Sequence, residues 1–322
     1  MAELTARAAA KALGVSRATL YAYVSRGLIR SERGLIRSER GGGRERRYDS
    51  ADVAALLRGP ALAAPVIDTA IGCVRDRRLW LRGRDAVTLA RDLSVREAAS
   101  LIWQADPAAS FAADNLPAAG AALGDFPPAI RAVAALLAFD EPPPGDEAAL
   151  GLAGARLLRA MAAGIAGTAP SARPVEAVLA EAWGVDRARR PQLRAALILG
   201  ADETMDAATL ATRAAAGAGS GLAAAVAAGL LALPDAESSE VDARGEFLLR
   251  LIGKSHAAVS LAVARGTLAA ALGLPADAAS VLRQLGRAIG LIAHAAEARN
   301  DARGIVPRPR YIGVLPDAAA NP

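Results

Sequence analysis

The sequence is poor in aromatic residues, cysteine and histidine, and each shortage excludes a class of protein. Phe, Tyr and Trp make up 3% of the 322 residues, so the core must be built from Ala, Leu and Val. Strand formers such as Ile, Tyr, Phe and Thr are scarce, which favours closely packed helices over sheets. The single cysteine, Cys73, excludes an intrachain disulfide and indicates a reducing compartment. The two histidines, His256 and His294, cannot make a zinc site alone, so we predict no metal.

Several motifs of enzymes and membrane proteins are also missing. The sequence has no glycine-rich phosphate fingerprint, no GxSxG, no HExxH and no Walker motif, so we expect no cofactor. Met1–Leu13 carries charges and lacks the apolar run of a secretory signal. Ala214–Leu233 is uncharged but consists mostly of Ala and Gly, which predicts a close-packed pair of buried helices rather than a membrane span. We therefore expect a cytoplasmic protein.

The positive charge is concentrated at the N-terminus. Residues 1–60 hold twelve Lys and Arg against six Asp and Glu, a net +6, which leaves −1 for the remainder of the total of +5. A small, locally basic domain is typical of proteins that bind the phosphate backbone of nucleic acids.

The basic region has the pattern of a helix-turn-helix. Leu4–Leu13 is predicted to form a first helix, and Ser16 is predicted to cap a second helix, Arg17–Arg26, that buries Leu20 and Val24. Two helices joined by a short Gly-containing turn place the second helix in a DNA major groove. After it, GLIRSER occurs twice in succession, at 27–33 and 34–40, which predicts a lengthened β-wing or loop.

The stretch LTARAAAKALGVSRATLYAYVSRGLI…RYDSADVAALL resembles a MerR-type winged helix-turn-helix over the first 58 residues. The resemblance implies DNA contacts by residues of the second helix and its end: Arg17, Thr19, Tyr21, Tyr23 and Arg26. The alternative is an interaction or oligomerisation module with the same fold.

The rest of the chain reads as helices. We predict a domain at 1–59, a linker at 60–68 and a helical domain at 69–322. Apolar periodicity predicts helices at 86–104, 150–167 and 175–183 and a long helical segment at 193–209. Within that segment Asp202, Glu203 and Asp206 form an acidic cluster, which is either a metal or general-base site or a helix cap.

Four motifs of this domain resemble the citrate synthase family, and they keep the family's order over residues 69–313: LWLRGRDA with VREAASLIWQ, LILGADETMDAAT, GRAIGLIAHAAE and IVPRPRYIG. The resemblance implies an all-helical, two-fold dimeric body. The predicted fold is therefore mainly α, with an N-terminal winged helix-turn-helix followed by an all-helical citrate synthase-like body.

The residues that citrate synthases use for chemistry are largely missing. By resemblance, a catalytic His would lie in Pro234–Glu240, which has none, and the catalytic Asp would lie in Ser260–Ala262, which has no carboxylate. Glu203 replaces the His that binds oxaloacetate in the family. His256 is the one candidate left for the second catalytic His, and the segment around 234–265 is shortened.

Two arginines of the stretch Gly286–Gly313 match the family's substrate-carboxylate arginines, namely Arg287 and Arg308. The sequence thus predicts a homodimeric DNA-binding regulator that is catalytically impaired and binds a carboxylate or acyl-CoA. One alternative is a citrate or methylcitrate synthase acting on acetyl-CoA or propionyl-CoA. The other is a non-catalytic subunit that pairs with a complete paralogue.

Overall fold

The computed structural model divides into two compact units, residues 1–68 and 69–322, and each is described by itself. The structure describes residues 3–13, 15–25, 31–35, 44–49, 67–117, 126–139, 144–234, 240–254 and 259–301. Most of the predicted linker, the wing tip and the Pro-Arg-Pro-Arg tail lie outside these residues.

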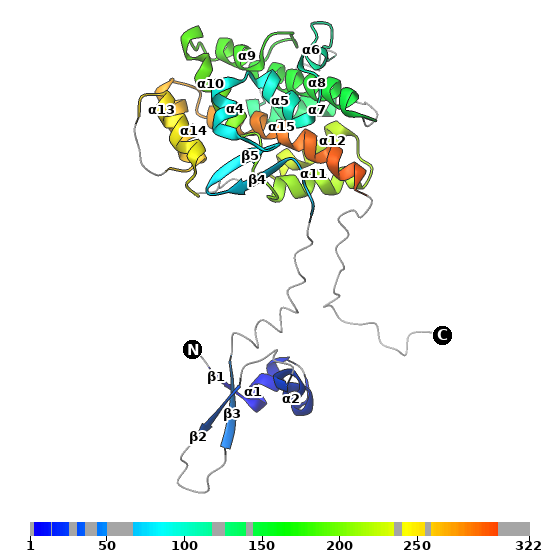
Figure 1. Ribbon diagram of the computed structural model, residues 1–322, viewed down its shortest axis with the longest axis vertical. Helices are drawn as coiled ribbons and strands as arrows, with labels where there is room; N and C mark the ends of the chain where they lie inside the picture. Colours follow the sequence, from blue (N-terminus) through cyan, green and yellow to red (C-terminus); the bar gives the residue numbers. More distant parts are fainter. Residues whose placement is uncertain are drawn as a thin grey trace, which may run out of the picture. The chain divides into compact units, whose positions relative to one another are not determined.

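The first unit consists of two helices and a three-stranded antiparallel sheet in the order β1-β3-β2 (Figure 1). Its elements are β1 (Glu3–Thr5), α1 (Ala6–Leu13), α2 (Arg17–Ser25), β2 (Ser31–Leu35) and β3 (Arg44–Asp49). The predicted wing is confirmed as the hairpin of β2 and β3. The predicted first helix began too early, because Leu4 pairs with Tyr48 in the sheet.

The second helix begins and packs as its sequence predicts. Ser16 Oγ accepts a hydrogen bond from Thr19 N at 3.1 Å, which satisfies one of the free amides at the start of α2. Leu20 is fully buried with Tyr48 and Ala9, and Val24 packs against this small core.

The second unit opens with an antiparallel hairpin sheet: β4 (Gly72–Arg75), β5 (Arg78–Leu81) and β6 (Arg84–Asp85). Its helices are α4 (Ala86–Asp92), α5 (Val95–Trp103), α6 (Pro107–Ser110), α7 (Pro128–Leu137), α8 (Glu147–Ala166), α9 (Val175–Ala182), η1 (Arg187–Arg189), α10 (Arg190–Leu199), α11 (Ala207–Gly217), α12 (Leu222–Leu231), α13 (Ala243–Leu251), α14 (Leu261–Ala271) and α15 (Ala278–Asn300).

Two predicted helices are wrong because a capping residue interrupts each one. The helix predicted at 86–104 is broken at Ser94, which forms a reciprocal capping box with Glu97 and starts α5. The segment predicted at 193–209 ends its first helix at Leu199, and Asp206 starts α11 by accepting a hydrogen bond from Thr209 N. The apolar periodicity continues across both breaks, so it conceals them.

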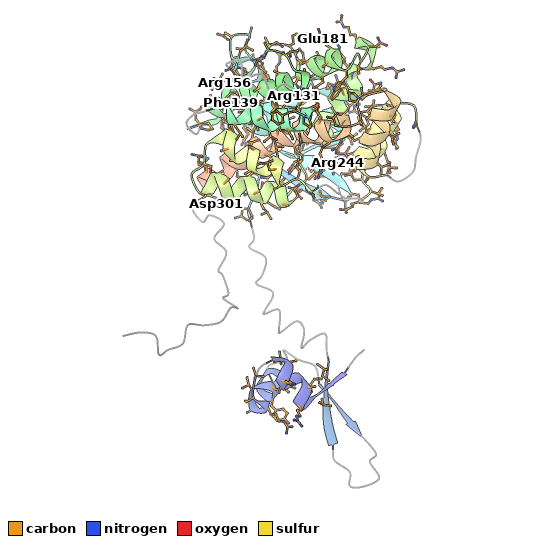
Figure 2. The ribbon with its side chains drawn as sticks, turned by 180° about the vertical axis from the view of Figure 1, so that it is seen from behind. Arg131, Phe139, Arg156, Glu181, Arg244 and Asp301 are labelled. Carbon is orange, nitrogen blue, oxygen red and sulfur yellow. The ribbon has the colours of Figure 1, made fainter. Side chains whose placement is uncertain are left out.

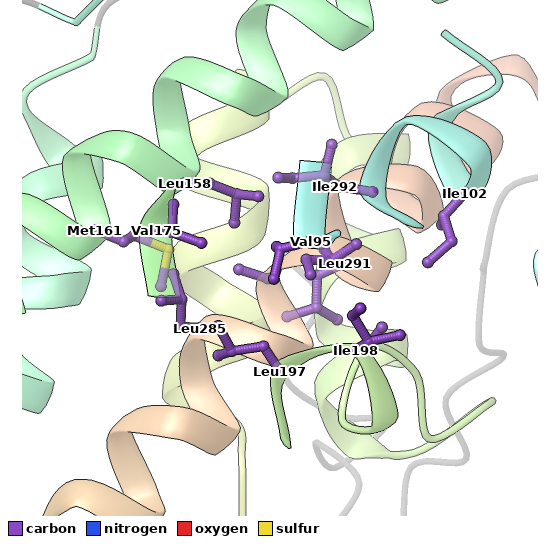
Figure 3. Close-up of a cluster of buried hydrophobic side chains, with 14 of the residues drawn as sticks. Val95, Ile102, Leu158, Met161, Val175, Leu197, Ile198, Leu285, Leu291 and Ile292 are labelled. Carbon is purple, nitrogen blue, oxygen red and sulfur yellow. The ribbon is translucent and has the colours of Figure 1, made fainter. Parts of the chain in front are cut away.

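Helix α15 lies at the centre of the body. It is buried nearly all round, as expected for an internal helix. Figure 3 shows part of the surrounding apolar core, where side chains of α5, α8, α9, α10 and α15 meet. Trp103 packs into the same core, and its Nε1 donates to the Ile289 carbonyl of α15 at 2.9 Å.

The predicted helix pair at 214–233 is confirmed by α11 and α12, which pack against each other and against α15. Among the described helices, α8 alone is long and apolar enough to cross a membrane, and 72% of its apolar window is buried inside the body. Its end is held by Arg131 of α7, labelled in Figure 2, which donates to the carbonyls of Gly164 and Ile165 at 2.8 and 2.7 Å.

We expect Gly290→Ala to destabilise the body, because a Cβ at Gly290 of α15 would lie 2.1 Å from the Ala201 carbonyl oxygen. The cost of such overpacking is about 1–3 kcal/mol. Gly266→Ala in α14 is the matched control. Among the described residues, no atom outside the adjoining backbone of α14 and its two chain neighbours lies within 4 Å of the added Cβ, so it should stabilise the helix by about 0.5–1 kcal/mol. Thermal unfolding measures both, and shifts of the same sign would contradict this packing.

Candidate functional site

The exposed face of α2 carries two of the predicted DNA contacts. Arg17 and Tyr21 are exposed and lie four residues apart, on the same side of the helix, while Leu20 faces the core. Thr19 is half-buried, and its Oγ1 lies 2.9 Å from Ser16 Oγ, so it also belongs to the helix cap. The side chain of Tyr23, and all of Arg26, lie outside the described residues.

Arg287, the predicted carboxylate ligand of α15, is completely buried and bound to the protein's own carboxylates. Its Nη1 donates to Asp202 Oδ1 at 3.0 Å, and its Nη2 donates to Asp206 Oδ1 at 2.8 Å. Nη2 also donates to Thr209 Oγ1 at 2.9 Å. The two carboxylates come from the turn between α10 and α11, so the fork of the guanidinium fixes this turn onto α15.

Further polar contacts link Asp202 through His294 and Arg213 to Glu297. His294 Nε2 lies 3.3 Å from Asp202 Oδ1, and since a carboxylate can only accept, Nε2 is the protonated nitrogen. Arg213 Nη1 lies 3.5 Å from His294 Nδ1 and donates to Glu297 Oε2 at 2.6 Å. Glu297 Oε1 in turn accepts from the backbone amide of Ala70 at 2.8 Å. We call the residues Asp202, Asp206, Arg213, Arg287, His294 and Glu297 the central charge network.

The central charge network has no positive charge in excess. Two arginines face three carboxylates within it, so Arg287 does not present a free cation to a ligand. Burial alone would raise the pKa of the Asp202 carboxyl, but the hydrogen bond from His294 and the charge of Arg287 outweigh burial and lower it. Burial likewise opposes ionisation of Glu297, yet hydrogen bonds from Ala70, Thr69 and Arg213 lower its pKa.

Two other residues that the citrate synthase resemblance singled out, Glu203 and Ser260, have partners of their own. Glu203 Oε2 lies 3.6 Å from Arg283 Nη2, so a different arginine of α15 neutralises it. Ser260, at the position expected for the catalytic Asp, caps the start of α14. His256 and Arg308 lie outside the described residues, so their predicted roles stay predictions.

Sequence reasoning missed the partners of Arg287. The interpretation of Asp206 as a helix cap is confirmed, but Asp206 also binds Arg287, and Asp202 is an internal ion-pair partner. The four-residue spacing of Asp202 and Asp206 was the available signal, although the two lie at a turn and not on one helical face. The contact of Thr209 with Arg287 and the place of His294 in the network had no local signal.

Replacing Asp202 tests the network. Asp202→Asn leaves the buried Arg287 with Asp206 as its remaining carboxylate partner in the network, so it should lower stability at pH 7 by about 1.5–3 kcal/mol. Because the folded pKa of Asp202 is depressed, its contribution is complete above the unfolded pKa of about 3.9 and is lost as the pH falls through the folded value.

The difference between wild type and Asp202→Asn should therefore shrink below about pH 4. Asp186→Asn is the control, because the exposed Asp186 side chain caps no helix amide. Urea unfolding at several pH values measures both variants. Equal stability of Asp202→Asn and Asp186→Asn at pH 7 would contradict the network.

Comparison with known proteins supports both units. Residues 3–60 match the helix-turn-helix domain family. No curated protein sequence matches the chain. The structure is similar to that of citrate synthase from Thermotoga maritima, with a TM-score of 0.62 and 17% identity over 80% of this chain and 96% of the other.

Two further solved structures are similar at comparable levels. Citrate synthase from Thermoplasma acidophilum, solved as a ternary complex with carboxymethyl coenzyme A and oxaloacetate, has a TM-score of 0.58 and 14% identity over 79% of this chain and 95% of the other. Citrate synthase from Pyrobaculum aerophilum has a TM-score of 0.59 and 15% identity over 89% and 96%. The chain therefore combines an N-terminal helix-turn-helix domain with a body of the citrate synthase fold.

Proposed function

We propose that this protein is a DNA-binding regulator whose citrate synthase-fold body does not turn over acyl-CoA. The observation that carries the proposal is the state of Arg287, whose two terminal nitrogens are both bound by internal carboxylates. A guanidinium that is already neutralised provides little attraction for a substrate dicarboxylate. The missing catalytic His and Asp positions of the sequence point in the same direction.

The DNA-binding part of the proposal rests on the first unit. The net charge of +6 over residues 1–60, the match to the helix-turn-helix family and the exposed pair Arg17 and Tyr21 all suit a helix that enters the major groove. We further propose that the unit is a MerR-type domain and that its wing lies along the DNA phosphates.

A two-fold dimer in the cytoplasm completes the proposal. Exposed apolar side chains lie on the neighbouring helices α7 and α12, with Ile130 51%, Leu137 66% and Leu231 75% exposed in the single chain. Covering them in a homodimer would remove apolar surface from water and would match a pseudo-palindromic operator.

A carboxylate effector would reach Arg287 by displacing Asp206, because Asp206 is 21% exposed whereas Asp202 is fully buried. Displacement would also remove the cap of α11, so ligand binding and the start of this helix are coupled in the proposal. Arg308 is the second proposed carboxylate contact.

The alternative function is condensation of acetyl-CoA or propionyl-CoA with oxaloacetate, and the shared fold favours it. Thiol release from acetyl-CoA in the presence of oxaloacetate distinguishes the two. We expect none. Turnover by the wild type that is lost in His256→Ala would overturn the proposal.

DNA binding is tested by fluorescence anisotropy with upstream and random duplexes at several salt concentrations. Affinity should fall as salt rises, because phosphate contacts release counterions. Arg17→Ala should weaken binding by about 1–3 kcal/mol. Arg187→Ala is the control, an exposed arginine of the body with no ion-pair partner among the described residues. Binding that is absent, or the same in both variants, would contradict the proposal.

Asp206→Asn tests the block at Arg287. Asparagine keeps an oxygen that can cap α11 but removes the charge that competes with a ligand. Oxaloacetate or citrate should therefore raise the melting temperature of Asp206→Asn more than that of the wild type, with affinity higher by about tenfold or more. Asp186→Asn serves as the control. An unchanged affinity in Asp206→Asn would show that Asp206 does not limit access to Arg287.

A further inference from the structure

A cavity of about 290 Å³ lies where the N-terminal ends of α5, α6 and α9 meet (helices labelled in Figure 1). None of its lining residues belongs to the central charge network. Its volume is at the lower end of the range for small-molecule sites, roughly 300–1,000 Å³. Val95, Phe111 and Val175 give it apolar walls, and four charged residues also line it, namely Arg96, Glu97, Arg173 and Glu176.

Two of these four charges are already committed. Glu97 Oε2 accepts from Ser94 N at 2.8 Å and from Ser94 Oγ at 2.7 Å, as part of the cap of α5. Arg173 forms an ion pair with Glu181, a residue labelled in Figure 2. The charges left for a ligand are therefore one cation, Arg96, and one carboxyl, Glu176.

Arg96 and Glu176 come from different helices and do not neutralise each other by contact. Within the part of the chain that the structure describes, they form no ion pair with one another, and Arg96 has no hydrogen-bond partner. The Arg96 guanidinium lies 5.9 Å from the centroid of the Phe111 ring. The Glu176 carboxyl accepts from its own backbone amide, and burial raises its pKa against the opposing charges of Arg194, Arg96 and Arg190.

The aromatic wall of the cavity is held rigidly. The Phe111 ring stacks on Trp103, with centroids 6.0 Å apart and an interplanar angle of 11°. The guanidinium of Arg159, a residue that is 3% exposed, also lies over the Phe111 ring, 5.5 Å from its centroid. Arg159 is fixed by bonds to the carbonyls of Phe111, Ala112 and Asn115 at 2.9, 2.9 and 2.5 Å. A wall fixed in this way is organised before any ligand arrives.

We propose that this cavity binds a small zwitterion, namely an α-amino acid with an apolar side chain. Its carboxylate would pair with Arg96, its ammonium group would donate to Glu176, and its side chain would pack on Phe111, Val95 and Val175. A dicarboxylate fits less well because Glu176 would repel it, and a simple amine fits less well because Arg96 would repel it.

The test is isothermal titration of the full-length chain with L-leucine and L-phenylalanine. Two analogues, 4-methylpentanoate and isoamylamine, lack the amino group and the carboxylate of leucine respectively. We expect saturable binding of at least one amino acid and affinities lower by about tenfold or more for both analogues. Arg96→Gln and Glu176→Gln should each reduce affinity by a similar factor, and Arg187→Gln, outside the cavity, should leave it unchanged.

The absence of saturable binding of either amino acid at millimolar concentration, or unchanged binding in both cavity variants, would overturn the proposal. If 4-methylpentanoate binds as tightly as leucine, the site is an anion site and the zwitterion assignment is wrong. Thermal unfolding of both variants checks that they fold. The titration contains no DNA, so its outcome is independent of whether the proposed regulator binds DNA.

Discussion

The ion pair between Arg287 and Asp202 is the interaction on which the body depends. Neither side chain has any exposed surface, and an isolated charge in the protein interior costs several kcal/mol. The two residues must therefore stay together, and this need fixes the turn after α10 against the central helix. Gly72 at the start of β4 packs closely against Asp202, because a Cβ at this position would lie 2.5 Å from Asp202 Oδ2. Strand, turn and helix are thus positioned by one pair of charges.

The citrate synthase fold persists here at 14–17% identity because an internal helix and its apolar neighbours define it, and many sequences satisfy such a pattern. The chemistry of a site depends instead on a few side chains and on what they face. In this chain two of the three arginines of α15 face carboxylates of the same chain: Arg287 faces Asp202 and Asp206, and Arg283 faces Glu203. The same backbone can therefore carry a binding site or a closed core, depending on a handful of charges.

Local signals in the sequence were enough for much of the fold. The cap at Ser16, the buried Leu20 and the helices α8 and α9 follow from capping residues and periodicity. The breaks at Ser94 and Asp206 carried cap signals too, but apolar spacing on both sides outweighed them. The central charge network was not predictable, because Asp202 and Arg287 are 85 residues apart and a sequence contains no distance between them. The same holds for Arg96 and Glu176, whose helices meet only in the folded body.

The hydrogen bond from Ala70 to Glu297 joins the first described residues of the body to its last helix, and this has a consequence for biosynthesis. The core residues that the structure describes in the helix-turn-helix unit precede position 50, so they leave the ribosome early in translation. The body lacks its central helix until residue 300 has left the ribosome. A chain that stops short of α15 would thus carry the helix-turn-helix unit on a body that cannot close. If the unit binds DNA as proposed, such truncated chains would compete with the full-length protein for its operator, so degradation of incomplete chains matters more here than for a single-unit protein.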